Sequence, residues 1–165
     1  MRKTITSAFI VTIIASTFIA CVKETEKAAQ DTGILPTTCG SDGHRLQATI
    51  DGVNYCGNAQ VIATGDSTTV IATGVDLLGN TIVVQADSLV VGEQAINMTS
   101  NGVLLIQSGS TYNVTPDHPG TLTISQIDTS AHVFKASFDV MLHCELSGVN
   151  RHVVGNCDVV YTVGQ

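Results

Sequence analysis

The sequence predicts an all-β protein: a single antiparallel β-sandwich or barrel of about eight to ten strands, preceded by a signal peptide and a flexible tether. Short runs rich in β-branched residues recur through residues 45–163, each bounded by Gly, Asn, Asp or Pro. Several runs alternate apolar and polar residues, as half-buried strands do. No segment after the first twenty residues keeps a helical period over two turns. These three observations favour one all-β domain over residues 39–165.

The first twenty residues have the order of a secretory signal. Arg2 and Lys3 form a basic start, and residues 8–20 are apolar or small throughout. A helix of that length reaches about 20 Å, whereas the bilayer hydrocarbon is roughly 30 Å thick. Residues 1–20 are therefore predicted to be a signal peptide rather than a membrane-spanning helix.

The signal ends in Phe18-Ile19-Ala20-Cys21, which resembles the lipobox of bacterial lipoproteins, with Phe18 where Leu is usual. In that family a diacylglycerol thioether forms on the cysteine, the signal is cut before it, and the new amino terminus is acylated. The resemblance implies that Cys21 is the lipidated first residue of the mature chain, held to the membrane by more than one acyl chain. The alternative is a secreted protein cleaved after Ala20 with a free cysteine.

Residues 21–38 are predicted to form a lipid-anchored flexible linker, because they are charged and small and have no apolar period. The seventeen residues after Cys21 have an r.m.s. reach of roughly 23 Å as a coil. Removal of Arg2 and Lys3 with the signal leaves five basic residues against 14 acidic ones, a net charge of about −9. This charge argues against nucleic acid and anionic lipid surfaces as partners.

The segment "RLQATIDGVNYC", residues 45–56, predicts the first hairpin. Asp51-Gly52 supplies the positive φ angles that a two-residue type I′ turn requires. Such a turn places Ile50 opposite Val53 and leaves Cys56 on the outer face beside Gln47. Because the preceding segment can cross that face, we expect a Cys39–Cys56 disulfide.

The middle of the chain predicts short strands in "VIATGDSTTVIATG", "NTIVVQA", "GVLLIQS", "STYNV" and "GTLTISQI". The repeated "VIATG" prompts a search for a solenoid, but no third copy follows. We therefore expect a hairpin that turns through Gly65, Asp66, Ser67 and Thr68, with Ile62 opposite Ile71.

The last two strands alternate over "VFKASFDVMLHCEL" and "VVGNCDVVYTV", with Cys144 and Cys157 on apolar faces. A hairpin turning through residues 147–151 predicts that Cys144 and Cys157 face each other and form a second disulfide, which constrains the unfolded chain by roughly 3 kcal/mol. The same register makes His143 and Asp158 neighbours on the outward face. Four cysteines can also bind a metal, but the chain has no C-x-x-C pair, so we expect no metal site and no cofactor.

The order of these motifs resembles a family of small Bacteroidota lipoproteins of unknown function over nearly all of residues 46–163. Members begin with A-T-[IV]-[DN]-G-x-x-[WY], contain G-x-D-x-x-G-N-x-I, and close with G-x-L-x-I…I-D…F…G-x-F-x-V-x-Y. This chain has "ATIDGVNY", "GVDLLGNTI" and "GTLTISQIDTSAHVFKASFDV" in that order, with Tyr55 where Trp is commoner and Ala136 and Asn156-Cys157 at positions usually held by Gly or Phe. The resemblance implies an envelope lipoprotein and brings no catalytic residues.

Two short patterns are similar to signals of the same phylum. Lys23-Glu24, with Glu26 following, is similar to a tag that sends lipoproteins to the cell surface, and the alternative is an ordinary solvated linker. Asp66-Ser67-Thr68 and Asp87-Ser88-Leu89 fit the D-[ST]-[AILMVT] pattern of periplasmic O-glycosylation, which makes Ser67 and Ser88 candidate sites.

The sequence predicts a non-catalytic, lipid-anchored envelope domain that binds a protein or glycan or supports a complex at the outer membrane, on either face, with the cell surface favoured. The five histidines form no H-x-H or H-E-x-x-H spacing, and no G-x-S-x-G elbow is present. One alternative is a carrier that holds a small ligand inside a barrel. Another is a glycan-binding protein, which the absence of Trp weakens.

Overall fold

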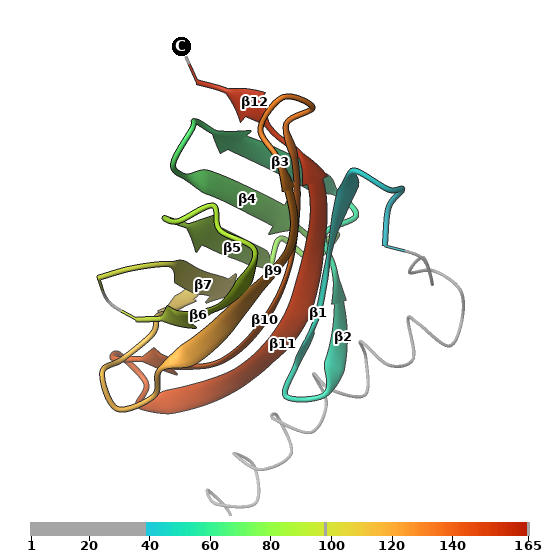
Figure 1. The fold of residues 1–165 in the computed structure, drawn as a ribbon. Helices are drawn as coiled ribbons and strands as arrows, with labels where there is room; N and C mark the ends of the chain where they lie inside the picture. The colour runs from blue at the N-terminus through green and yellow to red at the C-terminus, as the bar shows by residue number, and fades with distance from the viewer. Residues whose placement is uncertain (1–38, 98, 165) are drawn as a thin grey trace, which may run out of the picture. The chain divides into compact units, whose positions relative to one another are not determined.

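A computed structural model describes residues 39–97 and 99–164, and the described residues form twelve β-strands in two sheets with no helix (Figure 1). The two sheets pack on each other and do not close into a barrel, so the fold is the sandwich form of the predicted class. The predicted signal peptide and linker, Cys21 included, lie outside the described residues.

The first sheet has the order β2 (Val53–Cys56), β1 (His44–Ile50), β11 (Val149–Val160), β10 (Val133–Cys144), β9 (Gly120–Asp128) and β6 (Gly92–Ile96), all antiparallel. The second has the order β12 (Thr162–Val163), β3 (Gln60–Gly65), β4 (Val70–Val75), β5 (Thr81–Ala86), β7 (Gly102–Gln107) and β8 (Ser110–Tyr112). Only β12 pairs parallel, with β3. In Figure 1 the long strands of the first sheet run up the page and curve past those of the second, which run across it.

The core lies between the sheets and is built by the predicted alternation. Along β10 the residues Phe134, Ala136, Phe138, Val140, Leu142 and Cys144 are buried, while their neighbours are half-buried or exposed. Leu146 was expected to continue this inward row, but it lies in the turn after β10 and is 95% exposed. The second sheet contributes its own inward row, with Val70, Ala72, Ile82, Val84, Val103 and Leu105.

The first hairpin forms as the sequence predicts. Asp51 and Gly52 have φ angles of 51° and 79°, the left-handed conformation of a type I′ turn. The register pairs Ile50 with Val53 and Gln47 with Cys56, as expected. The dipeptide therefore fixes both the turn and the face on which Cys56 lies.

The hairpin of β3 and β4 is present, but its predicted register is wrong by two residues. Ile62 lies opposite Thr73 instead of Ile71, and the turn comprises residues 66–69. The carboxylate of Asp66 explains this turn, since it accepts hydrogen bonds from the backbone N–H groups of Thr68 (2.7 Å) and Thr69 (2.8 Å). Because the shift is two residues, Ile62 and Ile71 still lie on the same face of the sheet.

The predicted Cys144–Cys157 disulfide is wrong: both thiols are free and buried. Cys144 is the last residue of β10 and pairs with Val149, whereas Cys157 lies opposite Ala136. Ala136 and Cys144 are eight residues apart on one strand, or about 26 Å. The alternation placed both cysteines on the inward face correctly, but the turn starts directly after Cys144, where the N–H of Gly148 donates to the carbonyl oxygen of Cys144.

Candidate functional site

The most distinctive group of polar contacts fastens the start of the domain, where the chain continues toward the predicted lipid anchor. Cys39 and Cys56 form the predicted disulfide, with their Cα atoms 5.2 Å apart. The bond joins the first described residue to the end of β2, across 17 residues of sequence. Closing a loop of this size constrains the unfolded chain by about 3 kcal/mol. We call this disulfide and the contacts described next the junction clamp.

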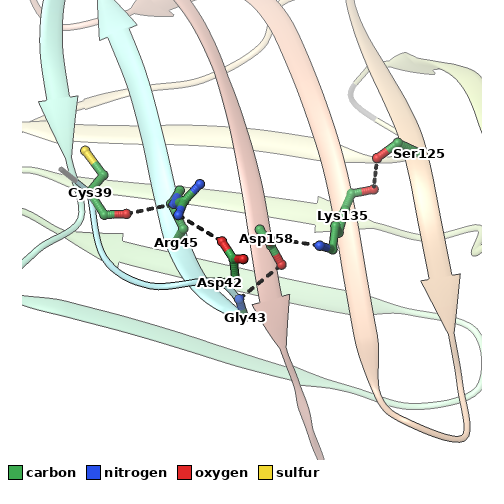
Figure 2. Close-up of polar contacts among 7 residues, drawn as sticks. All are labelled: Cys39, Asp42, Gly43, Arg45, Ser125, Lys135 and Asp158. Atoms are coloured by element: carbon green, nitrogen blue, oxygen red, sulfur yellow. Dashed lines mark hydrogen bonds and ion pairs between the residues drawn. The ribbon is translucent and has the colours of Figure 1, made fainter.

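Arg45 on β1 forms the second part of the junction clamp (Figure 2). Its Nε donates to the carbonyl oxygen of Cys39 (3.1 Å), and its terminal nitrogen forms an ion pair with Asp42 (3.0 Å). Asp42 is 85% exposed, so this ion pair adds little by itself. The side chain of Arg45 therefore holds the backbone of the segment before β1 against the sheet.

Asp158 on β11 forms the third part. One carboxylate oxygen accepts a hydrogen bond from the N–H of Gly43 (3.2 Å), and the other forms an ion pair with Lys135 (3.0 Å; Figure 2). The register places Asp158 between Arg45 on β1 and Lys135 on β10, so the row alternates in charge across three strands. The carbonyl oxygen of Gly43 also accepts from Val160 (2.8 Å), which ties the same turn to β11 twice.

A β-bulge in β9 extends these contacts. The register passes from Lys135 opposite Gln126 to Ala136 opposite Ile124, which leaves Ser125 unpaired in the ladder. The hydroxyl group of Ser125 donates to the carbonyl oxygen of Lys135 (3.1 Å; Figure 2). The bulge therefore supports the strand that carries the ion-pair partner of Asp158.

Sequence reasoning found the disulfide of the junction clamp but not its ionic part. Arg45, Asp158 and Lys135 have the outward parity of their strands, and that parity was readable from the alternation. Their contact depends on the register of the last hairpin, which was predicted wrongly. With that register corrected, His143 lies opposite Asn150 and is no neighbour of Asp158.

The contacts of the junction clamp are those of a structural site rather than a catalytic one. Its carboxylates are paired with Arg45, Lys135 and a backbone N–H, and it contains no nucleophile beside a base. Elsewhere His152 Nε2 lies 2.7 Å from Asp139, but both side chains are about half exposed on the outer face of the first sheet. A catalytic acid–base pair needs a concave site that excludes water. In residues 39–97 and 99–164 no group of three or more His, Cys, Asp or Glu residues is placed to hold a metal ion.

Ser67 and Ser88, the candidate glycosylation sites, both lie exposed at the surface. Ser67 is in the turn between β3 and β4, where Asp66 uses its carboxylate to hold Thr68 and Thr69. These hydrogen bonds lower the pKa of Asp66. Ser88 follows β5, and its carbonyl oxygen accepts a hydrogen bond from Gln94 (3.0 Å). An enzyme can reach both hydroxyl groups without opening a strand.

The aromatic side chains of the described domain lie in its core. All five Phe and Tyr residues of the described ranges are buried: Tyr55, Tyr112, Phe134, Phe138 and Tyr161. Across the described ranges, no aromatic ring of Phe or Tyr is therefore presented for stacking on a sugar. No helix of the described part is long and apolar enough to cross a membrane.

No protein-family model matches this chain, and no match was found among the curated proteins.

Proposed function

We propose that this protein is a non-catalytic lipoprotein of the bacterial outer membrane, anchored through lipid on Cys21, whose β-sandwich binds a protein or glycan partner or supports a complex in the cell envelope. The junction clamp is the structural observation that carries the proposal. A tethered domain is pulled at the residue where its linker ends, and here that residue is Cys39, bonded to Cys56 and hydrogen-bonded to Arg45. A force applied through the linker is therefore transmitted to β2 and β1 together, rather than to one strand alone.

The disulfide supports the same compartment. Disulfides persist in oxidising places such as the periplasm and the cell surface, and they are rare in the cytosol. The pair Cys39 and Cys56 is bonded, and the two other cysteines of the domain are buried. Lipidation of Cys21 then accounts for the fifth cysteine of the chain.

The alternatives receive less support. A carrier was expected from strands that close into a barrel around a pocket, whereas the two sheets form a sandwich around one cluster of buried hydrophobic residues. A glycan-binding platform usually needs exposed aromatic rings, and all five rings of the described domain are buried.

Cell fractionation tests the anchor. Replacement of Cys21→Ser should move the protein from the membrane fraction to the soluble fraction, because the thioether cannot form. Ser16→Ala, a change within the same signal, is the matched control and should leave the protein in the membrane. A Cys21→Ser variant that stays in membranes as firmly as the control contradicts the proposal.

Protease treatment of intact cells tests the membrane face. Loss of the domain from intact cells places it on the outer surface, as the Lys23-Glu24 pattern favours, and directs the search to glycan, host or nutrient-uptake partners. Digestion only after lysis places it in the periplasm and directs the search to envelope assembly.

A further inference from the structure

The outward face of the second sheet carries no charged residue over the described strands β3, β4, β5 and β7. We call this surface the uncharged face. Its middle row has one residue from each strand, aligned by the register: Ile62, Thr73, Val83 and Leu104. Ile62 is 48% exposed, and Ile106 in the next row is 38% exposed. Contiguous apolar side chains on the surface of a domain mark interaction sites.

Two exposed leucines lie at one end of the second sheet. Leu77 and Leu78 are 56% and 63% exposed and belong to the turn between β4 and β5. The carboxylate of Asp76 fixes this turn, since it accepts hydrogen bonds from the N–H groups of Leu78 (2.9 Å) and Asn80 (2.8 Å). The turn therefore holds two apolar side chains in water at a fixed place.

The outward face of the first sheet has a different character. It carries the ion pairs of the junction clamp, and the chain enters the domain there through Cys39, which is bonded to Cys56 and hydrogen-bonded by Arg45 (Figure 2). The point of entry is thus on the opposite side of the sandwich from the uncharged face. The segment that leads to the anchor therefore leaves the uncharged face open to another molecule.

The net charge of the chain indicates where two copies can meet. The formal net charge is −7 at pH 7, with 14 acidic residues. A contact through surfaces that carry carboxylates brings like charges together, which is strongly unfavourable. A contact through the uncharged face buries no carboxylate and gains free energy as Ile62, Leu104 and Ile106 leave water.

The middle row of the uncharged face is also complementary to itself. Its two ends are the apolar residues Ile62 and Leu104. A twofold axis that runs along the strands between β4 and β5 places Ile62 of one copy opposite Leu104 of the other. The same axis places Thr73 opposite Val83, so β-branched side chains meet at the centre. Twofold contacts of this kind are the commonest between identical chains.

The size of the face fits a weak dimer. Its four strands have six residues each and cover about 400 Å² as a flat patch. The accessible area is larger than this footprint because it follows the side chains, and Leu77 and Leu78 add to it. Specific protein interfaces begin at about 600 Å² on each partner. We therefore expect a reversible dimer rather than a permanent one.

We propose that the protein forms a symmetric dimer in which the uncharged faces of two copies pack on each other. The proposal goes beyond the envelope role and does not depend on the lipid anchor, since it uses only the second sheet. The charged face of each first sheet then lies on the outside of the dimer, with both junction clamps accessible. The dimer thus presents two copies of the charged face to other partners.

Crosslinking through an added cysteine tests the dimer in the full chain, expressed in cells. Thr73→Cys changes the middle row, where a short bis-maleimide reagent can join the two copies. Thr81→Cys, in the next row of the same face, repeats the test, and Ser137→Cys, on the outward face of β10, is the matched control. Cys144 and Cys157 are only 1% and 2% exposed, so the wild-type chain should not crosslink.

A charge placed in the contact gives a second test. Val83→Glu, added to Thr73→Cys, puts a carboxylate at the centre of the face, where it meets the same charge on the other copy. Pairing should weaken by about a hundredfold, and the crosslink should be lost. Val154→Glu makes the same change on the outward face of the first sheet, where Val154 is 37% exposed, and should leave the crosslink unchanged.

We expect a product of twice the chain mass from the variants at positions 73 and 81, and none from the variant at position 137. Absence of this product at both positions overturns the dimer, as does an equal yield at position 137. A product of any other mass also overturns it, since a different protein then covers the face. Fractionation of the same cells reports on the anchor separately, so loss from the membrane contradicts the proposed function while the crosslink still supports the dimer.

Discussion

The hydroxyl group of Tyr55, on β2 of the first sheet, donates a hydrogen bond to the carbonyl oxygen of Gly74, on β4 of the second. The same oxygen accepts from the N–H of Ile82 on β5 (3.3 Å). Tyr55 is 3% exposed, so these bonds are made in the core. One side chain therefore joins the hairpin that carries Cys56 to two strands of the opposite sheet.

Replacement of Tyr55→Phe should lower the free energy of unfolding by about 1–3 kcal/mol, because it leaves two buried backbone groups without their partner. Urea unfolding under non-reducing conditions measures this loss. Ser137→Ala, a change on the outer surface, should cost less than about 0.5 kcal/mol. Equal stability of the Phe variant and the wild type would contradict the role given to the hydroxyl group.

The same hydroxyl group predicts a pH dependence. Burial raises the pKa of Tyr55 well above its ordinary value of 10, and the hydrogen bond from Ile82 offsets this only in part. The unfolded state therefore loses the proton first, so the stability contributed is complete below pH 10 and is lost as the pH rises above that value. Burial also raises the pKa of Tyr161 and raises that of Cys157 to about 12, which adds to the trend.

Unfolding measured between pH 9 and pH 12 should show falling stability, by up to about 1.4 kcal/mol per pH unit for each such proton. Tyr55→Phe should show a shallower slope than the wild type. Parallel slopes for the two proteins would show that Tyr55 ionises alike in the folded and unfolded states.

The two free thiols should be inert in the native protein. Cys144 and Cys157 are only 1% and 2% exposed, so a reagent cannot reach either sulfur atom in the folded protein. Hydrogen bonds from Ser147 lower the pKa of Cys144, whereas burial raises the pKa of Cys157 and keeps it in the thiol form. Titration with a thiol reagent should detect neither in native protein, both after unfolding, and four after unfolding with reductant, when Cys39 and Cys56 are released. Finding no thiols in unfolded, non-reduced domain would instead restore the Cys144–Cys157 bond.

Asp158 should matter more to the junction clamp than Asp42. Asp158→Asn removes the charge that pairs with Lys135 and weakens the acceptor for the Gly43 N–H, with an expected cost of about 1 kcal/mol. Asp42→Asn is the matched control, since Asp42 is 85% exposed. Hydrogen exchange at Gly43 should quicken in the first variant and stay nearly unchanged in the second. Equal exchange in both would assign the strength of the clamp to the disulfide alone.

The sequence predictions were correct where a feature depends on residues close together in the chain, and wrong where it depends on the pairing of distant residues. Asp51-Gly52 determines its turn within two residues, so the first hairpin, its register and the Cys39–Cys56 bond were predicted correctly. The β10–β11 turn has no such dipeptide signal, and alternation fixes the face of a residue but not its partner. Cys144 and Cys157 were therefore placed on the correct face and paired wrongly.

The ionic part of the junction clamp and the residue rows across the second sheet needed the structure for the same reason. Asp158 meets Lys135 only through the long-range register of β10 and β11. Likewise, Ile62 and Leu104 share a row only because β3, β4, β5 and β7 lie in that order in one sheet. Two of the twelve strands were not predicted: β6 (Gly92–Ile96) is not a run of β-branched residues, and β12 has two residues, too few to show a period.

Mass spectrometry of the amino-terminal peptide, from protein purified out of the membrane fraction, tests the central claim most directly. The account predicts a chain that begins at Cys21 and carries the mass of a diacylglycerol group on its sulfur and an acyl group on its amino terminus. An unmodified chain that begins at Cys21, or one that retains residues 1–20, would contradict it.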